Sequence, residues 1–135
     1  MLQAKIENFS ETEIACKCCS KINVSDKGLI CLQAFRYYLN NKFKKNIRLN
    51  IESACRCINH NKEEGGEKLS RHECETKKSD AFDLTSPDID YKTLYQEAVA
   101  CKLFSTIIRY DKKHFVYADT RPRENYGIEA WGWNK

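Results

Sequence analysis

The sequence predicts a single α+β domain in which a small antiparallel sheet is flanked by helices. Two stretches, residues 26–40 and 86–104, carry apolar residues at helical spacing. Residues 46–53 alternate apolar and polar side chains, and the runs 105–110 and 114–120 are rich in β-branched and aromatic residues. Helices and strands in this order are typical of an α+β domain. The 135 residues are enough for one hydrophobic core.

The first half of the chain has clear helix signals. Ser10, followed three residues later by Glu13, has the spacing of a capping box at a helix N-terminus. The stretch 26–40 is predicted to be an amphipathic helix because its apolar residues recur on one face. These residues are Leu29, Leu32, Phe35, Tyr38 and Leu39.

Strands and turns follow this helix. Ile47, Leu49 and Ile51 alternate with polar residues, which predicts a half-buried strand over residues 46–53. Residues 59–70 are predicted to form a short helical turn that is ended by a glycine pair, Gly65-Gly66, and continues into a loop.

The second half begins with a short strand around "DAFDL" and continues with a helix. For that helix we expect Ser86 as the cap, Pro87 at the first helical position, and Leu94 and Ala98 on the buried face. The runs 105–110 and 114–120 are predicted to form a hairpin with "DKK" as its turn. The aromatic tail, residues 124–135, is expected to pack over the sheet or to line a cleft.

Charge and hydropathy exclude some functions. The net charge of +4 is small and the basic residues are dispersed, so we expect no nucleic-acid partner. No run approaches the roughly 18 apolar residues of a membrane span. The N-terminus lacks the pattern of a signal peptide, so we expect synthesis in the cytoplasm, with any action at a cell wall reached by another release route. We expect a monomer.

The chain contains eight cysteines, a high number for its length. Without a signal peptide, thiols or a metal site are expected in place of a disulfide framework. "CKCC" and "CRC" could meet as a thiolate zinc cluster built on Cys16, Cys18, Cys55 and Cys57, although a C-x-C spacing is tighter than usual. Such a cluster would make the protein a cytoplasmic zinc-binding module. Cys31 and Cys101 lie on apolar helix faces and are predicted to be core residues.

Residues 70–86, "SRHECETKKSDAFDLTS", bring a histidine and an aspartate together around a loop. Asp83 lies among the apolar residues Phe82 and Leu84, and a buried carboxylate is costly unless it is paired or bound to a metal. His72 and Asp83 are therefore candidate metal ligands.

Four segments, "ESACRCINHNKEEGG", "LSRH", "DAFDL" and "HFVYADTRP", together resemble the zinc D-alanyl-D-alanine carboxypeptidase family. These peptidoglycan peptidases share a metal-binding fold with the hedgehog signalling domain. The resemblance extends over most of the chain, and the order and spacing of several motifs agree. It implies a zinc metallopeptidase that hydrolyses peptide bonds of cell-wall stem peptides with a zinc-bound water, as in phage lysis enzymes.

The resemblance also implies roles for individual residues. Ser53 and Arg56 match a motif whose arginine binds a substrate carboxylate, which suits the bidentate geometry of a guanidinium. Ser70 is likewise expected to bind substrate, and His72 and Asp83 to bind zinc. Ten residues separate this histidine and aspartate, against six in the family, so Asp80 is the alternative ligand.

The third zinc ligand departs from the family pattern. Tyr117 stands where relatives have a histidine, and a neutral tyrosine is a poor zinc ligand. Asp119, His114 and Cys74 are the other candidates for this position, and Asp119 and His114 are the candidate catalytic residues. The departure leaves open a catalytically inactive homologue that binds wall peptides or a protein partner.

Overall fold

The computed structural model describes residues 9–57, 61, 70–75, 77–123 and 127–134. The elements are α1 (Glu11–Ile14), α2 (Asp26–Phe43), β1 (Asn50–Ser53), β2 (Ala81–Thr85), α4 (Tyr91–Ala100), β3 (Thr106–Tyr110), β4 (Phe115–Asp119) and β5 (Glu129–Trp133). The predicted α+β fold is confirmed. The turn predicted to end at Gly65-Gly66 lies outside the described residues.

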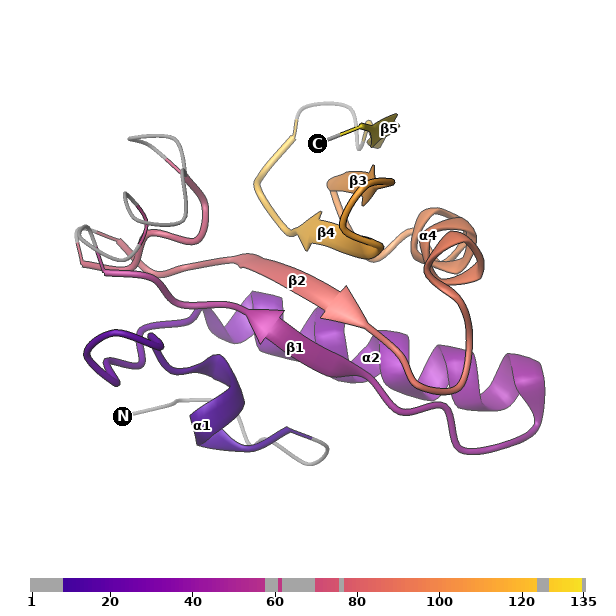
Figure 1. The fold of residues 1–135 in the computed structure, drawn as a ribbon, viewed down its shortest axis with the longest axis horizontal. Helices are drawn as coiled ribbons and strands as arrows, with labels where there is room; N and C mark the ends of the chain where they lie inside the picture. Colours follow the sequence, from indigo (N-terminus) through magenta and orange to yellow (C-terminus); the bar gives the residue numbers. More distant parts are fainter. Residues whose placement is uncertain (1–8, 58–60, 62–69, 76, 124–126, 135) are drawn as a thin grey trace.

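Five strands form one sheet in the order β1-β2-β4-β3-β5 (Figure 1). The pairs β1–β2, β2–β4 and β3–β4 are antiparallel, as predicted, and the hairpin of β3 and β4 forms. The aromatic tail was expected to cover the sheet or line a cleft. Two of its residues, Gly127 and Ile128, line a hollow, and its later part supplies β5, which pairs in parallel with β3 at the edge of the sheet and is exposed along its length.

The helix caps explain where the helices begin. The Ser10 hydroxyl accepts a hydrogen bond from the backbone N–H of Glu13 at 3.2 Å, which confirms the capping box. The prediction that Ser86 caps α4 is wrong, because the Asp90 carboxylate accepts the Thr93 N–H at 2.7 Å and fills that position. Among the helices that the structure describes, none combines the length and apolar content needed to cross a membrane.

The two faces of the sheet bury different side chains. Phe82, Leu84 and Val116 point into the main hydrophobic core, and Figure 1 shows α2 running behind β1 and β2. Ala81 and Tyr117 belong to a second, smaller cluster with Ile108. Because successive residues of a strand point to opposite faces, Asp83 shares the face of Ala81 and Tyr117. This second face carries the polar residues that the sequence singled out.

Candidate functional site

His72 is buried and held by both ring nitrogens. Nδ1 lies 2.9 Å from the carbonyl oxygen of Ala54. A carbonyl only accepts hydrogen bonds, so Nδ1 is protonated and donates to Ala54. Nε2 lies 3.2 Å from Oδ1 of Asp83. A carboxylate also only accepts, so this contact holds either a proton on Nε2 or a metal ion between the two atoms.

Asp83 lies in the middle of β2 and contacts Arg56 on its other side. Its Oδ2 accepts a hydrogen bond from Arg56 at 3.1 Å. The same guanidinium donates to the Ser53 hydroxyl at 2.9 Å and reaches Asn61 Oδ1 at 3.5 Å. A register shift in β1 sets Ser53 opposite Asp83. The structure therefore brings Arg56 to the predicted site, where it holds the Asp83 carboxylate in place.

The backbone around His72 is tied to the segment that carries Arg56. The Arg56 N–H donates to the His72 carbonyl, and the Cys74 N–H donates to the Arg56 carbonyl, both at 2.8 Å. A disulfide joins Cys55 to Cys74 across these two segments. The Ser70 hydroxyl accepts the His72 N–H at 3.2 Å and so shapes the turn before the histidine. Cys74 is therefore wrong as a candidate metal donor, because its sulfur is in the disulfide.

Tyr117 lies opposite Asp83 in the β2–β4 ladder, and its ring centroid is 5.5 Å from that of His72. Its hydroxyl donates to Oδ2 of Asp119 at 2.6 Å. Arg121 donates to the same carboxylate oxygen through Nε at 2.8 Å. Burial, and then the charge of Asp119, raise the pKa of the Tyr117 hydroxyl well above its ordinary value of 10.0. Tyr117 is therefore a neutral phenol.

His72 and Asp83 fit two of the three protein ligands of a catalytic zinc ion, and Tyr117 does not fit the third. Ligand atoms on one tetrahedral zinc lie about 3.3 Å apart when the bonds are about 2.0–2.1 Å. The 3.2 Å between His72 Nε2 and Asp83 Oδ1 matches that separation. The Nδ1–H bond to Ala54 is the outer contact that orients a ligating histidine. Tyr117 does not fit as a third ligand, because its hydroxyl is neutral and donates a hydrogen bond to Asp119.

The Tyr117 hydroxyl is expected to stay protonated until the protein unfolds. Its folded-state pKa lies above the unfolded value, so its contribution to stability is present below about pH 10 and is lost as the pH rises further. We would titrate tyrosinate absorbance in the wild type and in Tyr117→Phe. The variant should lose the signal of one tyrosine from the final, unfolding-linked step. A loss from an earlier step would contradict the buried neutral phenol.

The remaining candidates lie in other surroundings. His114 is exposed in the turn before β4, has φ 60°, and stacks on Tyr91 with ring centroids 4.5 Å apart. It lies three positions before Tyr117, outside β4, and the ring that it contacts is that of Tyr91. Asp80 pairs with Arg71, with Oδ1 accepting from Nε at 2.9 Å. Of Asp83 and its alternative Asp80, Asp83 is the one that faces the histidine.

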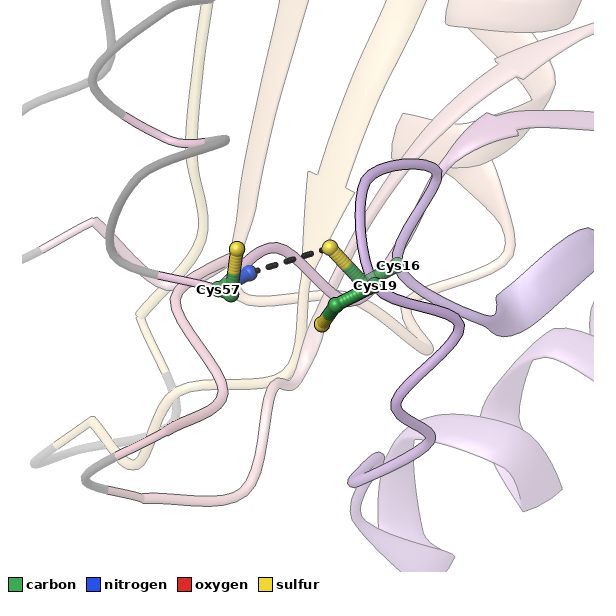
Figure 2. Close-up of side chains that lie close together, drawn as sticks. All are labelled: Cys16, Cys19 and Cys57. Carbon is green, nitrogen blue, oxygen red and sulfur yellow. Dashed lines mark hydrogen bonds between the residues drawn. The ribbon is translucent and has the colours of Figure 1, made fainter.

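A second group of potential ligands lies in the N-terminal part of the chain. The sulfurs of Cys16, Cys19 and Cys57 all lie within 4.8 Å of one another (Figure 2). The predicted cluster is wrong in two members, because Cys55 is in the disulfide and Cys19 takes the place given to Cys18. The predicted cluster used Cys16 and Cys18, which have a C-x-C spacing. Cys16 and Cys19 have the C-x₂-C spacing of known zinc sites, and that spacing would have indicated the pair that the structure brings together.

The surroundings of the Cys16 sulfur favour its thiolate form. Burial opposes ionisation of its thiol, but backbone N–H groups of Cys57, Cys19 and Cys18 and the Cys57 side chain outweigh that effect. The pKa of the Cys16 thiol falls from 9.0 to about 7. The Cys57 N–H lies 3.2 Å from the Cys16 sulfur.

A cationic hollow of about 470 Å³ adjoins the end of β4. Arg121, which bonds Asp119, lies in its wall. The other basic residues that line it are Lys27, Lys102 and Arg123. A hollow with this lining suits an anionic group such as a peptide carboxylate.

Comparison with known proteins identifies a family. The family model described as peptidase M15 matches residues 7–119. The matched range includes α1, the three clustered cysteines, His72, Asp83 and all of β4, whereas β5 lies beyond it. A search of curated proteins gave no match.

Proposed function

The chain belongs to the peptidase M15 family, and from this membership we propose that it is a zinc peptidase acting on peptidoglycan stem peptides. Peptidases of this family are metal-dependent and typically use zinc. The single observation that carries the proposal is the 3.2 Å approach of His72 Nε2 and Asp83 Oδ1 on the second face of the sheet. Two buried acceptors at that separation are what a shared zinc ion requires.

The residues of the chain prepare this site for a peptide. When bound, zinc supplies a Lewis acid for the scissile carbonyl and acidifies a water molecule. Arg56 fixes the Asp83 carboxylate, and Ala54 fixes the tautomer of His72, so both ligand atoms are oriented before metal arrives. The Tyr117 hydroxyl donates its hydrogen bond to Asp119, and its oxygen, which Arg121 Nη2 approaches at 3.4 Å, can also accept a hydrogen bond from a substrate N–H.

Asp119 has a supporting role in this arrangement. It is fully buried, and its carboxylate accepts hydrogen bonds from Tyr117 and from the backbone and side chain of Arg121. Asp119 is therefore a positioning residue for Tyr117 and Arg121. Arg121 in turn faces the cationic hollow, where the free carboxylate of a stem peptide would be attracted.

The test combines metal binding with turnover. We would measure zinc affinity and release of D-alanine from a muropeptide for the wild type and for His72→Ala and Asp83→Asn. Both variants should lose zinc at this site and lose zinc-dependent cleavage. Asp111→Asn, which removes a carboxylate that pairs with Arg109, is the matched control and should behave as the wild type. Equal loss in the control would overturn the assignment.

A second candidate function is peptide binding without hydrolysis. The specific observation in its favour is Tyr117, a neutral phenol at the third ligand position. It predicts saturable muropeptide binding by the wild type with no D-alanine released at any zinc concentration. Zinc-dependent turnover that is lost in His72→Ala would exclude this function.

A further inference from the structure

Three cysteines from two distant segments converge in the N-terminal part of the molecule. Cys16 and Cys19 lie on the loop after α1, and Cys57 follows Arg56 on the segment opposite (Figure 2). All three sulfurs lie within 4.8 Å of one another. Sulfurs on one tetrahedral zinc lie about 3.8 Å apart, since each Zn–S bond is about 2.3 Å. The distances between the three sulfurs therefore exceed the zinc-bound value by at most about 1 Å.

The loop that carries Cys16 and Cys19 is closed by its own backbone. The Ser20 N–H donates to the Cys16 carbonyl, and the Cys16 N–H donates to the Lys21 carbonyl, both at 2.8 Å. Ser20 adopts the left-handed conformation with φ 64° that such a tight return requires. The two cysteines stand at the C-x₂-C spacing of structural zinc sites. The turn is thus shaped before any metal binds.

The partner segment approaches with a donor directed at sulfur. The Cys57 N–H lies 3.2 Å from Cys16 Sγ, which is the dashed contact in Figure 2. Close by, the Cys55 N–H donates to the Ile14 carbonyl at 3.3 Å and ties the same two segments together. A backbone N–H directed at a thiolate is an outer contact of the kind that supports metal–thiolate ligands.

We propose that Cys16, Cys19 and Cys57 form a structural thiolate site for zinc, separate from the His72–Asp83 pair. Thiolates select zinc over harder divalent cations. Cys16 and Cys57 are buried, whereas Cys19 is exposed, so the fourth position opens toward solvent. The sequence also has His60 at a C-x₂-H spacing after Cys57, but it lies outside the described residues and the proposal uses the three sulfurs alone.

The site would fix the segment that carries Arg56. Arg56 lies between Cys55, which is in the disulfide, and Cys57, which would be bound to metal. Both neighbours of the arginine would then be anchored, one to the His72 segment and one to the N-terminal loop. This proposal does not depend on peptidase activity.

The first measurement is cobalt binding to metal-free protein under anaerobic conditions. Thiolate ligation produces intense sulfur-to-cobalt charge-transfer absorption, which a histidine–carboxylate site lacks. The wild type and His72→Ala should both show this absorption. Cys19→Ser should lose part of it and bind cobalt more weakly by about 100-fold, the upper part of the range for an outer contact, because a direct ligand is removed. Cys18→Ser, which changes the exposed neighbour in the same loop, is the matched control and should equal the wild type.

The second measurement is the zinc X-ray absorption spectrum of His72→Ala, in which the other site is disabled. Three sulfurs with one nitrogen or oxygen donor would support the proposal. It is overturned if the wild type shows no thiolate–cobalt absorption, if Cys18→Ser loses as much as Cys19→Ser, or if peptide mapping finds a disulfide within the three cysteines. Because Cys19 is exposed, its variant tests the site without disturbing the buried core.

Discussion

Replacing Tyr117 by histidine is expected to raise the zinc affinity of the His72–Asp83 site by about 100-fold. The change of even an outer contact of a metal ligand alters affinity by about 10–100-fold, and a third direct ligand should reach at least the upper part of that range. The phenol now present is neutral and committed to Asp119. An imidazole would supply the missing donor.

A histidine at position 117 would lie close to the other two ligands, so the gain in zinc affinity is expected at the His72–Asp83 site. It lies directly opposite Asp83 in the β2–β4 ladder, and its ring already packs edge-on against His72. Asp119, which now accepts a hydrogen bond from the phenol, could accept one from the N–H of the new imidazole instead. A carboxylate in that place is a common outer partner of a ligating histidine.

Competition with a chelator of known affinity would measure the change, in protein that carries Cys16→Ser, Cys19→Ser and Cys57→Ser, which removes all three thiolates of the other proposed site. Tyr117→Phe is the matched control, because it keeps the ring and removes the hydroxyl. It should bind zinc as the parent does. If Tyr117→Phe loses zinc, the phenol is a ligand and our assignment fails. If Tyr117→His gains both zinc affinity and muropeptide cleavage, a third ligand limits the cleavage of the parent.

Removing the Cys55–Cys74 disulfide is expected to lower the free energy of unfolding by about 3 kcal/mol, because the bond closes a loop of about 20 residues in the unfolded chain. The two cysteines are 19 positions apart and both are buried. The same bond joins the segments that carry Arg56 and His72. The double variant Cys55→Ala/Cys74→Ala should therefore lose zinc affinity at His72 as well as stability.

Urea unfolding of the metal-free proteins would measure the stability change. A reducing agent should destabilise the wild type to the level of the double variant and should leave the double variant unchanged. The pair Cys31→Ala/Cys101→Ala removes as many cysteines but no disulfide, and should not alter the response to reductant. An equal response of the wild type with and without reductant would show that the bond does not contribute.

Local sequence patterns predicted the elements whose partners lie nearby in the chain. The spacing of Leu29, Leu32 and Phe35 predicted α2, and the hairpin of β3 and β4 followed from two β-rich runs around a short turn. β5 was not predicted because its parallel partner is not set by a turn, and because its exposed residues need no apolar alternation. The start of α4 was misplaced because Ser86 and Asp90 are both acceptable caps, and only packing selects between them.

The candidate site was predictable where a motif fixed the spacing. His72 and Asp83 were selected as a pair despite the inserted loop, and the structure places them in contact. Which cysteines bond to one another could not be read in the same way, because eight cysteines allow many pairings. Cys55 and Cys74 are joined by the fold that brings β1 and β2 together, a long-range contact that no local pattern encodes.

The order of the strands has a consequence for motion at the site. β2 lies between β1 and β4, and β4 lies between β2 and β3, so both strands are paired on each side. Fluctuations that open a sheet start at its edges, here β1 and β5, and interior strands exchange their amide hydrogens only in larger openings. Asp83 and Tyr117 are neighbours across these two interior strands. We therefore expect the backbone separation of Asp83 and Tyr117 to stay nearly constant during the small openings that begin at the edges of the sheet.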